Sequence, residues 1–243
     1  MAIELPEEVV SLLQFIGINW PDVNEDKVRE FGGHVRDFAT KLDETHQDST
    51  AHVKQMADVY QGASYDTLME KWDRLSSGHM SEMVTACHTV ATALEVAADV
   101  IVTMKGVAIA ELIGLAVSFV ADQAAAVLTF GLAEAAEALI IAAAKKCIDY
   151  LEQQLEQHII GAVIEAAINP LVDVVGKAVT GLVFGAVESA LGGSGGGDGG
   201  VGSGFSVHPE ELQARAELMH QQAEKVAAHA DEFTARVSGV SFA

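Results

Sequence analysis

The sequence predicts an all-α protein: a long antiparallel helical hairpin that extends into a helical bundle and carries a tethered C-terminal helix. Two observations support this fold class. Mostly apolar seam positions recur at steps of three and four, strictly alternating over residues 28–59 and less regularly over 68–94, which is the period of helices that pack along their length. In addition, no window alternates apolar and polar residues for long enough to predict a strand.

The composition limits the classes of partner. Half of the 243 residues are hydrophobic, and 14 Lys and Arg stand against 35 Asp and Glu, so the formal net charge is −21. Such an acidic chain gains nothing from counterion release on a phosphate backbone, and we predict no nucleic-acid partner. The two cysteines, Cys87 and Cys147, are too few for a disulfide framework or a four-ligand zinc site, and we expect both to be buried and structural.

The amino terminus predicts a short amphipathic helix and no cleaved signal peptide. The helix is expected over residues 6–16, because Pro6 suits the first helical position and Gly17 stops the apolar pattern. The opening MAIELPEEVV is acidic where a signal peptide needs Lys or Arg. If the protein leaves the cell, we therefore expect a route that needs no cleaved signal.

The hairpin is predicted over about residues 24–104. The seam of its first helix, polar in the middle, comprises Val28, Phe31, Val35, Phe38, Leu42, Thr45, Ser49, His52, Met56 and Val59. We expect Gly62 to end this helix in a left-handed conformation and Ser64 to cap the next helix. The second seam comprises Leu68, Trp72, Leu75, His79, Met83, Ala86, Val90 and Leu94. Two such helices joined by a tight turn run antiparallel.

Residues 105–191 are also predicted to be helical, but they differ from the hairpin because small residues recur at every fourth position. This spacing allows close helix packing, in a membrane or in a tight bundle. The candidate packing residues are Gly106, Gly114, Gly181 and Gly185. Over residues 84–187, the most apolar part of the chain, uncharged runs reach only about ten residues, against the roughly 18–20 that a membrane span needs, so no single-pass span is predicted.

A Gly/Ser linker is predicted at residues 192–204 from its composition, GGSGGGDGGVGSG. It divides the chain into a helical domain, residues 1–191, and a C-terminal amphipathic helix, residues 205–243. The apolar stripe of that helix comprises Leu212, Ala216, Met219, Ala223, Val226, Ala230 and Phe233. A single tethered helix has to bury its apolar face. We therefore expect it either to dock back on the chain or to bind another chain.

Enzyme motifs match only formally. The glycine-rich run satisfies G-x-S-x-G and G-x-G-x-x-G, but both chemistries need a strand before the glycines. Two pairs, Glu217 with His220 and Asp43 with His46, place a carboxylate and an imidazole on one helix face. A di-iron bundle needs two such motifs and two further glutamates. We predict no catalytic, cofactor-binding or metal-binding residues, and no enzyme activity.

The predicted turn contains Tyr60-Gln61-Gly62, in which the glycine makes the turn and the aromatic ring closes the open end between the helices. The hairpin resembles the WXG-type hairpins of type VII (ESX) secretion, with Tyr60 in place of the usual tryptophan. Residues 5–190 look more closely similar to the amino-terminal domain of actinobacterial CpnT-like proteins, in segments 18–24, 117–126 and 151–157. Residues 207–233 resemble the first helix of the small EspC-like secreted proteins.

The resemblance implies a non-enzymatic type VII secretion module, secreted or associated with the cell envelope, that mediates export and assembly with helical partners. The implied partners are small WXG-type or EspC-like proteins, the secretion machinery and an associated toxin. The residues expected at the turn and along the partner seam are Tyr60, Gly62, Phe31, Phe38, Leu68, Trp72 and Leu75. The alternative is a membrane-inserting channel component of the envelope, a role associated with CpnT-like domains. The 35 carboxylates, costly to bury in lipid while ionised, argue against it.

Two features depart from the family pattern. The usual secretion signal is a tyrosine followed four residues later by Asp or Glu, whereas here the residues four after Tyr60, Tyr65 and Tyr150 are Ser64, Met69 and Gln154. We expect the signal on a paired partner or on a part of the chain outside this sequence. No toxin follows residue 204, which fits either a truncated chain or a stand-alone component encoded beside a toxin.

Overall fold

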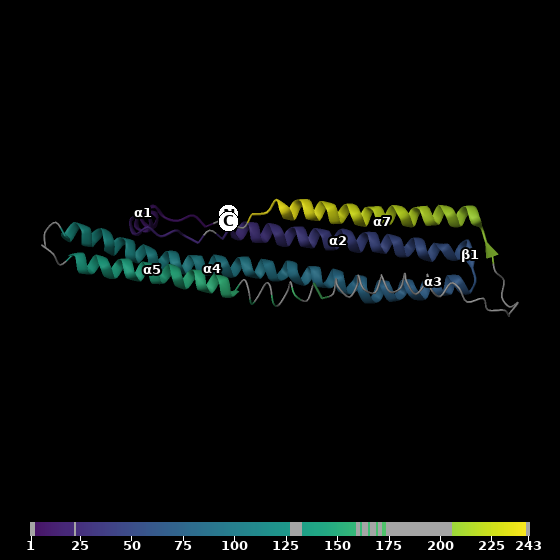
Figure 1. Ribbon diagram of the computed structural model, residues 1–243, viewed down its shortest axis with the longest axis horizontal. Coiled ribbons are helices and arrows are strands. Elements are labelled where there is room, and N and C mark those ends of the chain that lie inside the picture. Colours follow the sequence, from purple (N-terminus) through teal and green to yellow (C-terminus); the bar gives the residue numbers. More distant parts are fainter. Residues whose placement is uncertain are drawn as a thin grey trace. The chain divides into compact units, whose positions relative to one another are not determined.

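The computed structural model is all-α, as the sequence predicts (Figure 1). It describes residues 3–21, 23–126, 133–158 and 206–241, together with residues 161, 165, 169, 172 and 173. The helices are α1 (Glu7–Ile16), α2 (Glu25–Gln55), α3 (Ala63–Arg74), α4 (Ser81–Ala126), α5 (Ala133–His158) and α7 (Pro209–Ser238). The shorter elements are a 3₁₀ turn η1 (Met56–Asp58), a π-helical segment η2 (Leu75–Met80) and two-residue strands β1 (Tyr60–Gln61) and β2 (Ser206–Val207).

Contacts divide the chain into two compact units, which we describe separately. The first comprises Met1–Phe31, Ala93–Ala166 and Val240–Ala243, and the second comprises Gly32–Thr92 and Ala167–Gly239. The boundaries after Phe31 and Thr92 fall within α2 and α4, so each of these helices contributes to both units. The predicted domain boundaries at residues 191 and 204 lie outside the described residues and stay predictions.

In the first unit, α1 begins at Glu7, one residue after the predicted start, and ends where the sequence predicts. Pro6 is its N-cap, and the acidic residues of its first turn face the positive end of the helix dipole. Gly17 follows the helix with a φ of 70°, a conformation that glycine adopts at little cost. The buried side chains of α1 are Val9, Leu12 and Leu13.

Helices α4 and α5 supply the rest of this core. The buried positions of α4 continue at steps of three and four beyond residue 94, where the predicted seam stops, as far as Phe119. In the first unit they include Leu94, Ala98, Ile101, Lys105, Ala108, Leu112, Ala116 and Phe119. On α5 the buried residues are Ile140, Ala144, Cys147, Ile148, Leu151 and Leu155. The small residues that recur at every fourth position of α4 lie on its exposed side, so they do not interrupt its buried seam.

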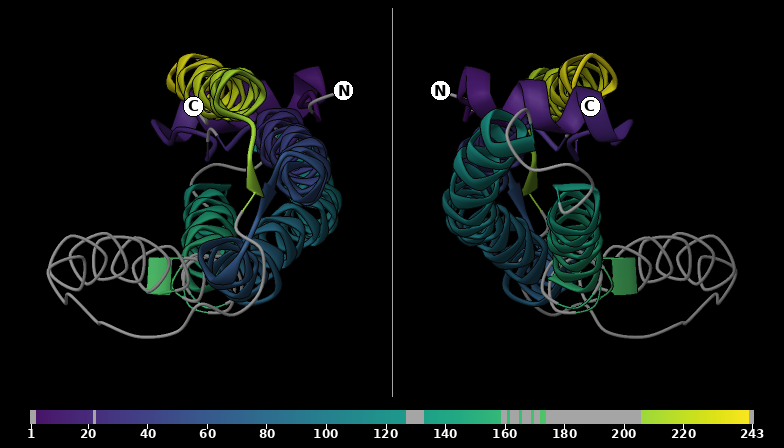
Figure 2. Two further views of the ribbon diagram at one scale, coloured as in Figure 1. Left: turned by 90° about the vertical axis from the view of Figure 1, so that its right-hand side faces the viewer. Right: turned by 90° about the vertical axis from the view of Figure 1, so that its left-hand side faces the viewer.

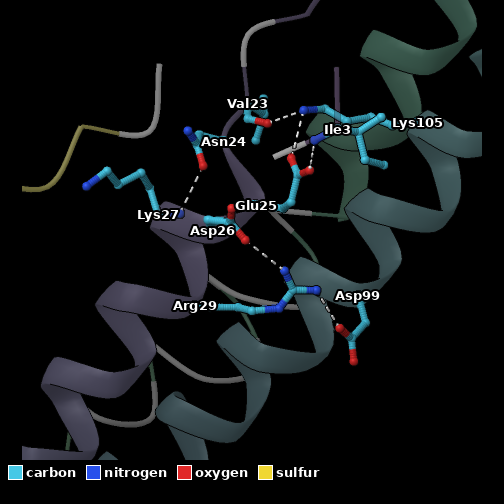
Figure 3. Close-up of polar contacts among 9 residues, drawn as sticks. All are labelled: Ile3, Val23, Asn24, Glu25, Asp26, Lys27, Arg29, Asp99 and Lys105. Atoms are coloured by element: carbon cyan, nitrogen blue, oxygen red, sulfur yellow. Dashed lines mark hydrogen bonds and ion pairs between the residues drawn. The ribbon is translucent and has the colours of Figure 1, made fainter. Parts of the chain in front are cut away.

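A buried ion pair interrupts this apolar core (Figure 3). Lys105 donates to Glu25 Oε2 at 2.9 Å, and the side chains are 5% and 0% exposed, respectively. The backbone N–H of Ile3 donates to Glu25 Oε1 at 2.7 Å, and Lys105 also donates to the carbonyl of Val23. Burial alone would raise the pKa of Glu25, but the hydrogen bond from Lys105 and the backbone donors lower it. The pair fastens the start of α2 and the amino-terminal segment to α4.

In the second unit, most of the predicted seam of the first hairpin helix is confirmed on α2, but Phe38 and His52 are half-buried and the adjacent Ala39 and Val53 are the buried positions. The buried seam positions include Val35, Leu42, Thr45, Ser49, Met56 and Val59, the last two just beyond the helix end. The two polar positions make local hydrogen bonds or reach a neighbouring helix: Ser49 donates to the carbonyl of Thr45 at 2.8 Å, and Thr45 pairs with His229. The mid-seam polarity is therefore accommodated.

The turn between the hairpin helices differs from the prediction. Helix α2 ends at Gln55, and η1 and β1 follow before Gly62, so the glycine does not end the first helix. Gly62 is instead the N-cap of α3, with a φ of 141°. Its carbonyl accepts the backbone N–H of Tyr65 at 2.9 Å. Ser64, expected as the cap, lies inside α3. The need for glycine is predicted correctly, but it arises one element later.

The second hairpin helix is interrupted by η2, which the periodic pattern does not reveal. The π-helical segment adds a residue to one turn of the helix. Before and within η2, the seam residues Leu68, Trp72, Leu75 and His79 are half-buried. After it, Cys87 becomes the buried position where Ala86 was predicted. Val90 and Leu94 are buried as predicted, so the seam as a whole keeps its predicted register.

Candidate partner-binding surface

Helix α7 lies alongside α2 in the second unit, as Figures 1 and 2 both show. Near the start of α7, Arg215 Nη1 donates to Gln55 Oε1 at 2.6 Å, and near its end Lys41 Nζ donates to Glu232 Oε2 at 2.9 Å. The residue order is opposite on the two helices, so they are antiparallel. Of the two expectations for the C-terminal helix, the structure shows the one in which it docks back on the chain.

The hairpin turn holds the start of α7 through backbone bonds. Strands β1 and β2 pair antiparallel, with Tyr60 opposite Val207 and Gln61 opposite Ser206. The backbone N–H of His208 donates to the carbonyl of Val59 at 2.9 Å. The sequence could not reveal this pairing, because a two-residue strand has no alternation to detect.

The side chain of Tyr60 lies against a second tyrosine of the turn. The rings of Tyr60 and Tyr65 meet edge to face, with centroids 6.4 Å apart and an interplanar angle of 83°. Tyr65 in turn donates its hydroxyl to the carbonyl of Lys54 at 3.3 Å. The predicted role of Tyr60 as a plug between the helices stays a prediction. The structure adds that its backbone anchors the strand before α7.

The far end of the α2–α7 contact combines an aromatic stack with charges. The rings of Phe38 and Phe233 stack with centroids 4.9 Å apart and an interplanar angle of 28°. Beside them, Lys41 bridges Glu232 at 2.9 Å and Asp37 at 3.0 Å, and Arg236 pairs with Asp37 at 2.9 Å.

This charge network lies largely in solvent. The hydrogen bond from Lys41 lowers the pKa of Asp37 and of Glu232, and these two carboxylates raise the pKa of Lys41. The side chains of Lys41, Asp37 and Glu232 are 28%, 44% and 40% exposed. Ion pairs this exposed contribute little to stability and are screened by salt. The network orients α7 on α2 more than it holds it there.

The face that α7 turns toward the hairpin is more polar than the predicted stripe. Leu212, Met219, Val226 and Phe233 are half-buried, but Ala216, Ala223 and Ala230 are exposed, so that part of the prediction is wrong. The positions between the apolar residues are filled by the side chains immediately before these alanines: Arg215, Gln222 and His229. Gln222 is 6% exposed, and His229 Nε2 lies 3.0 Å from Thr45 Oγ1. Hydrophobicity alone predicts that the alanines face the hairpin. Because the middle of the α2 seam is polar, the face of α7 that contacts it carries hydrogen-bonding side chains instead.

On another side of α2, the predicted residue Trp72 joins a polar cluster. Its Nε1 donates to Thr50 Oγ1 at 3.0 Å, and its ring stacks on His46 with centroids 5.4 Å apart. His46 Nε2 lies 2.6 Å from Ser76 Oγ in η2. Burial lowers the pKa of His46, and the nearby carboxylate of Asp43 partly opposes the shift. A cavity of about 380 Å³ adjoins the cluster and is lined by Asp43, His46, Thr50 and Ser76 among others.

The remaining predicted residues are not all brought together. Phe31 is half-buried in the first unit, whereas Tyr60, Gly62, Phe38, Leu68, Trp72 and Leu75 belong to the second. Gly106 and Gly114 are exposed, and a Cβ at either position would meet nothing within 4 Å among the atoms described. Gly181 and Gly185 lie outside the described residues. The role of these glycines in close helix packing stays a prediction.

The two cysteines, and the histidine of the Glu217–His220 pair, have surroundings that the structure describes. Both cysteines are free and buried, as expected. Burial raises the pKa of Cys87, and burial together with Glu111 raises the pKa of Cys147 to about 11, so both stay protonated thiols at neutral pH. His220 lies 3.5 Å from Glu224. In the described part of the chain, no cluster of three or more His, Cys, Asp or Glu residues could hold a metal ion.

One helical stretch, Tyr65–Gln123, is long and apolar enough to cross a membrane by length and composition. This corrects the prediction that no span is present, which counted only uninterrupted uncharged runs. A helix that tolerates one or two charges meets the same length requirement. Only 28% of its most apolar window is buried, and exposed side chains on α4 include Val96, Val107, Ile113, Val117 and Val120. Length and composition alone do not distinguish a span from a core helix.

A helical hairpin whose helices pack along a periodic apolar seam, with a glycine at the turn, is typical of the WXG-type class of proteins. Residues 2–146 match the family model described as the WXG100 like domain, and the chain belongs to this family. Membership gives it a role related to type VII secretion and a partnership with proteins of that system; WXG100-like domains are typically secreted. No curated protein and no solved structure matches the chain significantly. The family match ends within α5, so α7 lies outside it.

Proposed function

We propose that this protein is a non-enzymatic module of type VII secretion whose hairpin binds an amphipathic helix of a partner protein during export. The observation that carries this proposal is the α2 face that already holds one antiparallel amphipathic helix, α7. Helix pairs of this kind are a common mode of recognition between proteins, with anchors at steps of three and four. Phe38 supplies the aromatic anchor on α2, and Thr45 and Lys41 supply polar contacts.

The partner that best fits this face is a small helical protein of the WXG type or EspC type. Such a protein offers a helix long enough to follow α2, which has 31 residues. A helix that packs on the partly polar seam of α2 needs hydrogen-bonding residues between its apolar positions, as α7 has. An associated toxin is a further part of this proposal and rests on the resemblance to CpnT-like proteins.

Co-expression of the full chain with candidate small helical proteins of a type VII system tests the proposal. We expect one of them to co-elute in size-exclusion chromatography with light scattering. Phe38→Asp should abolish co-elution, because it places a carboxylate in the aromatic contact. Ala51→Asp, on the exposed side of the same helix, is the matched control and should leave co-elution intact. Equal co-elution of both variants would contradict a role for this face.

A second function, insertion into a membrane as a channel component, is favoured by one observation. The stretch Tyr65–Gln123 meets the length and composition of a span, and much of the apolar surface of α4 is exposed. The carboxylates of the chain oppose insertion while ionised, so this function predicts that acid promotes it. Liposome co-flotation with dye leakage at pH 7.5 and pH 5 separates the two functions. Flotation with leakage would support the channel, and its absence at both pH values would count against it.

A further inference from the structure

The contacts of α7 point to a regulatory role within the proposed function, on which this inference rests. We infer that α7 occupies the partner face of α2 as an intramolecular substitute, and that a partner helix binds by displacing it. The family-matched residues 2–146 contain α2 but not α7. The chain therefore carries, in addition to the family domain, its own helix for the face that we assign to a partner.

The first step of the argument is that α7 covers the face over most of the second-unit part of α2. The contacts of α7 and of its N-cap residue, His208, run from Gln55 and Val59 at the turn, through Thr45, to Lys41 and Phe38. A helix from another chain that bound the same residues of α2 would clash with the side chains of α7. Two helices cannot fill one groove, so binding of the partner and docking of α7 exclude each other.

The second step is that α7 is held weakly for a helix of 30 residues. Gln222 is its only buried side chain in the described part of α7. The Oε1 atom of Gln222 is itself buried and has no hydrogen-bond partner among the described residues. A buried acceptor without a donor disfavours the docked state. The ion pairs beside Phe233 lie largely in solvent and add little.

The third step concerns what a better occupant would carry. Arg215 contacts Gln55 and His229 contacts Thr45, which sets the antiparallel register. Gln222 is midway between Arg215 and His229, so this register places it near Ser49 and His52, midway between Thr45 and Gln55 on α2. His52 Nδ1 is also buried without a partner in the described part of the chain. A partner helix with a polar side chain that reaches His52 at this level would satisfy a group that α7 leaves unsatisfied. The fitting partner is therefore an antiparallel amphipathic helix with a hydrogen-bonding residue there.

Covalent attachment explains why a weakly held helix still covers the face. Intramolecular docking competes with an effective concentration on the order of 1 mM. If α7 itself bound this face with a dissociation constant of about 0.1 mM, the face would be free in roughly one molecule in ten. An added helix would then bind about tenfold more weakly than to an open face. Displacement is thus a modest barrier that a well-matched partner overcomes.

The experiment measures binding of a defined probe, a fluorescein-labelled peptide of residues 206–239, to the full-length chain by anisotropy. Phe233→Asp removes the aromatic stack and should free the face, so the peptide should bind about tenfold more tightly than to the unmodified chain. Ala235→Asp introduces the same charge two residues away at an exposed position and should leave binding unchanged. Equal affinity for all three chains would overturn the inference.

A second variant keeps the test decisive if Phe233→Asp disturbs folding. Gln61 and Ser206 are paired across β1 and β2, so Gln61→Cys with Ser206→Cys places two thiols on paired backbone positions. The oxidised chain should bind the peptide more weakly than the unmodified chain, and reduction should restore binding. Unaltered binding on oxidation would overturn displacement. If the peptide exchanges as expected but no small helical protein co-elutes with the chain, the covering role of α7 stands and the proposed function fails.

Discussion

Lys105 donates a hydrogen bond to Glu25 across 2.9 Å in the core of the first unit, where both side chains are almost completely buried. A lysine in the middle of an apolar seam is costly unless it is paired, and here the carboxylate and a backbone carbonyl satisfy it. Three separate stretches of sequence, around Ile3, Glu25 and Lys105, meet at this point (Figure 3). The pair therefore determines how α2 and the amino-terminal segment join α4.

Replacing one partner of this pair should be strongly destabilising. We expect Glu25→Gln to lower the free energy of unfolding by about 3–5 kcal/mol, because the Lys105 charge is left buried without a counter-charge. The double variant Glu25→Met with Lys105→Met should recover most of the loss, since no buried charge remains. Urea denaturation followed by circular dichroism measures both. A loss below about 1 kcal/mol for Glu25→Gln would show that the pair is solvated.

The stability of the second unit should depend on the protonation of His46. Burial lowers its pKa in the folded state relative to the unfolded value near 6.5, so the unfolded chain binds this proton more readily. The resulting stability is complete above about pH 6.5 and is lost as the pH falls through the folded pKa. We expect the unmodified chain to lose more stability between pH 7.5 and pH 5.5 than His46→Gln does.

Trp72 provides a local probe for that prediction because its ring stacks on His46. Protonation of the imidazole should alter the tryptophan emission before global unfolding, and His46→Gln should abolish the change. The difference between the two chains isolates the contribution of His46. Identical pH profiles of stability for both would contradict the prediction.

Gly62 should be essential at the hairpin turn. Its φ of 141° belongs to a region that other residues enter only at a cost of about 1–3 kcal/mol. We expect Gly62→Asp to destabilise the turn by that amount and to abolish folding or partner binding. Thermal unfolding and co-purification with a small helical partner measure the two effects. Unchanged co-purification and melting temperature would show that the turn tolerates a side chain.

Gly106 and Gly114 distinguish close helix packing from an exposed helix surface. A Cβ at either position would meet nothing within 4 Å among the described atoms, so Gly106→Ala and Gly114→Ala should each raise the unfolding free energy in water by up to about 1 kcal/mol. The gain arises because alanine restricts the unfolded chain and favours a helix. Chemical denaturation measures it. Destabilisation by either alanine, or loss of flotation with liposomes, would indicate that another helix packs closely there.

Much of the fold follows from local pattern. Most of the seam of α2, and the helix α1 with its Gly17 end, are predicted correctly, because burial at steps of three and four leaves a direct trace in the sequence. The need for glycine at residue 62 is also predicted, although its place in the turn is not. These features depend on residues that are close together along the chain.

The features that the sequence does not reveal depend on distant contacts. Lys105 looks like an interruption of an apolar helix until Glu25, 80 positions away, is placed beside it. The inward face of α7 is decided by the polar groups of α2, so Gln222 and His229 take the positions that hydrophobicity assigns to alanine. The π-helical segment η2 interrupts the second hairpin helix, and periodicity alone does not report such an interruption.

The central claim is that the α2 face holds one helix at a time. Hydrogen–deuterium exchange of the full-length chain, measured with and without a co-eluting small helical partner of type VII secretion, tests it most directly. On binding, the amides of α7 should lose protection while those of α2 keep theirs, because the partner replaces α7 on the same face. Unchanged protection of α7 in the complex would contradict the account, since the partner would then be bound elsewhere.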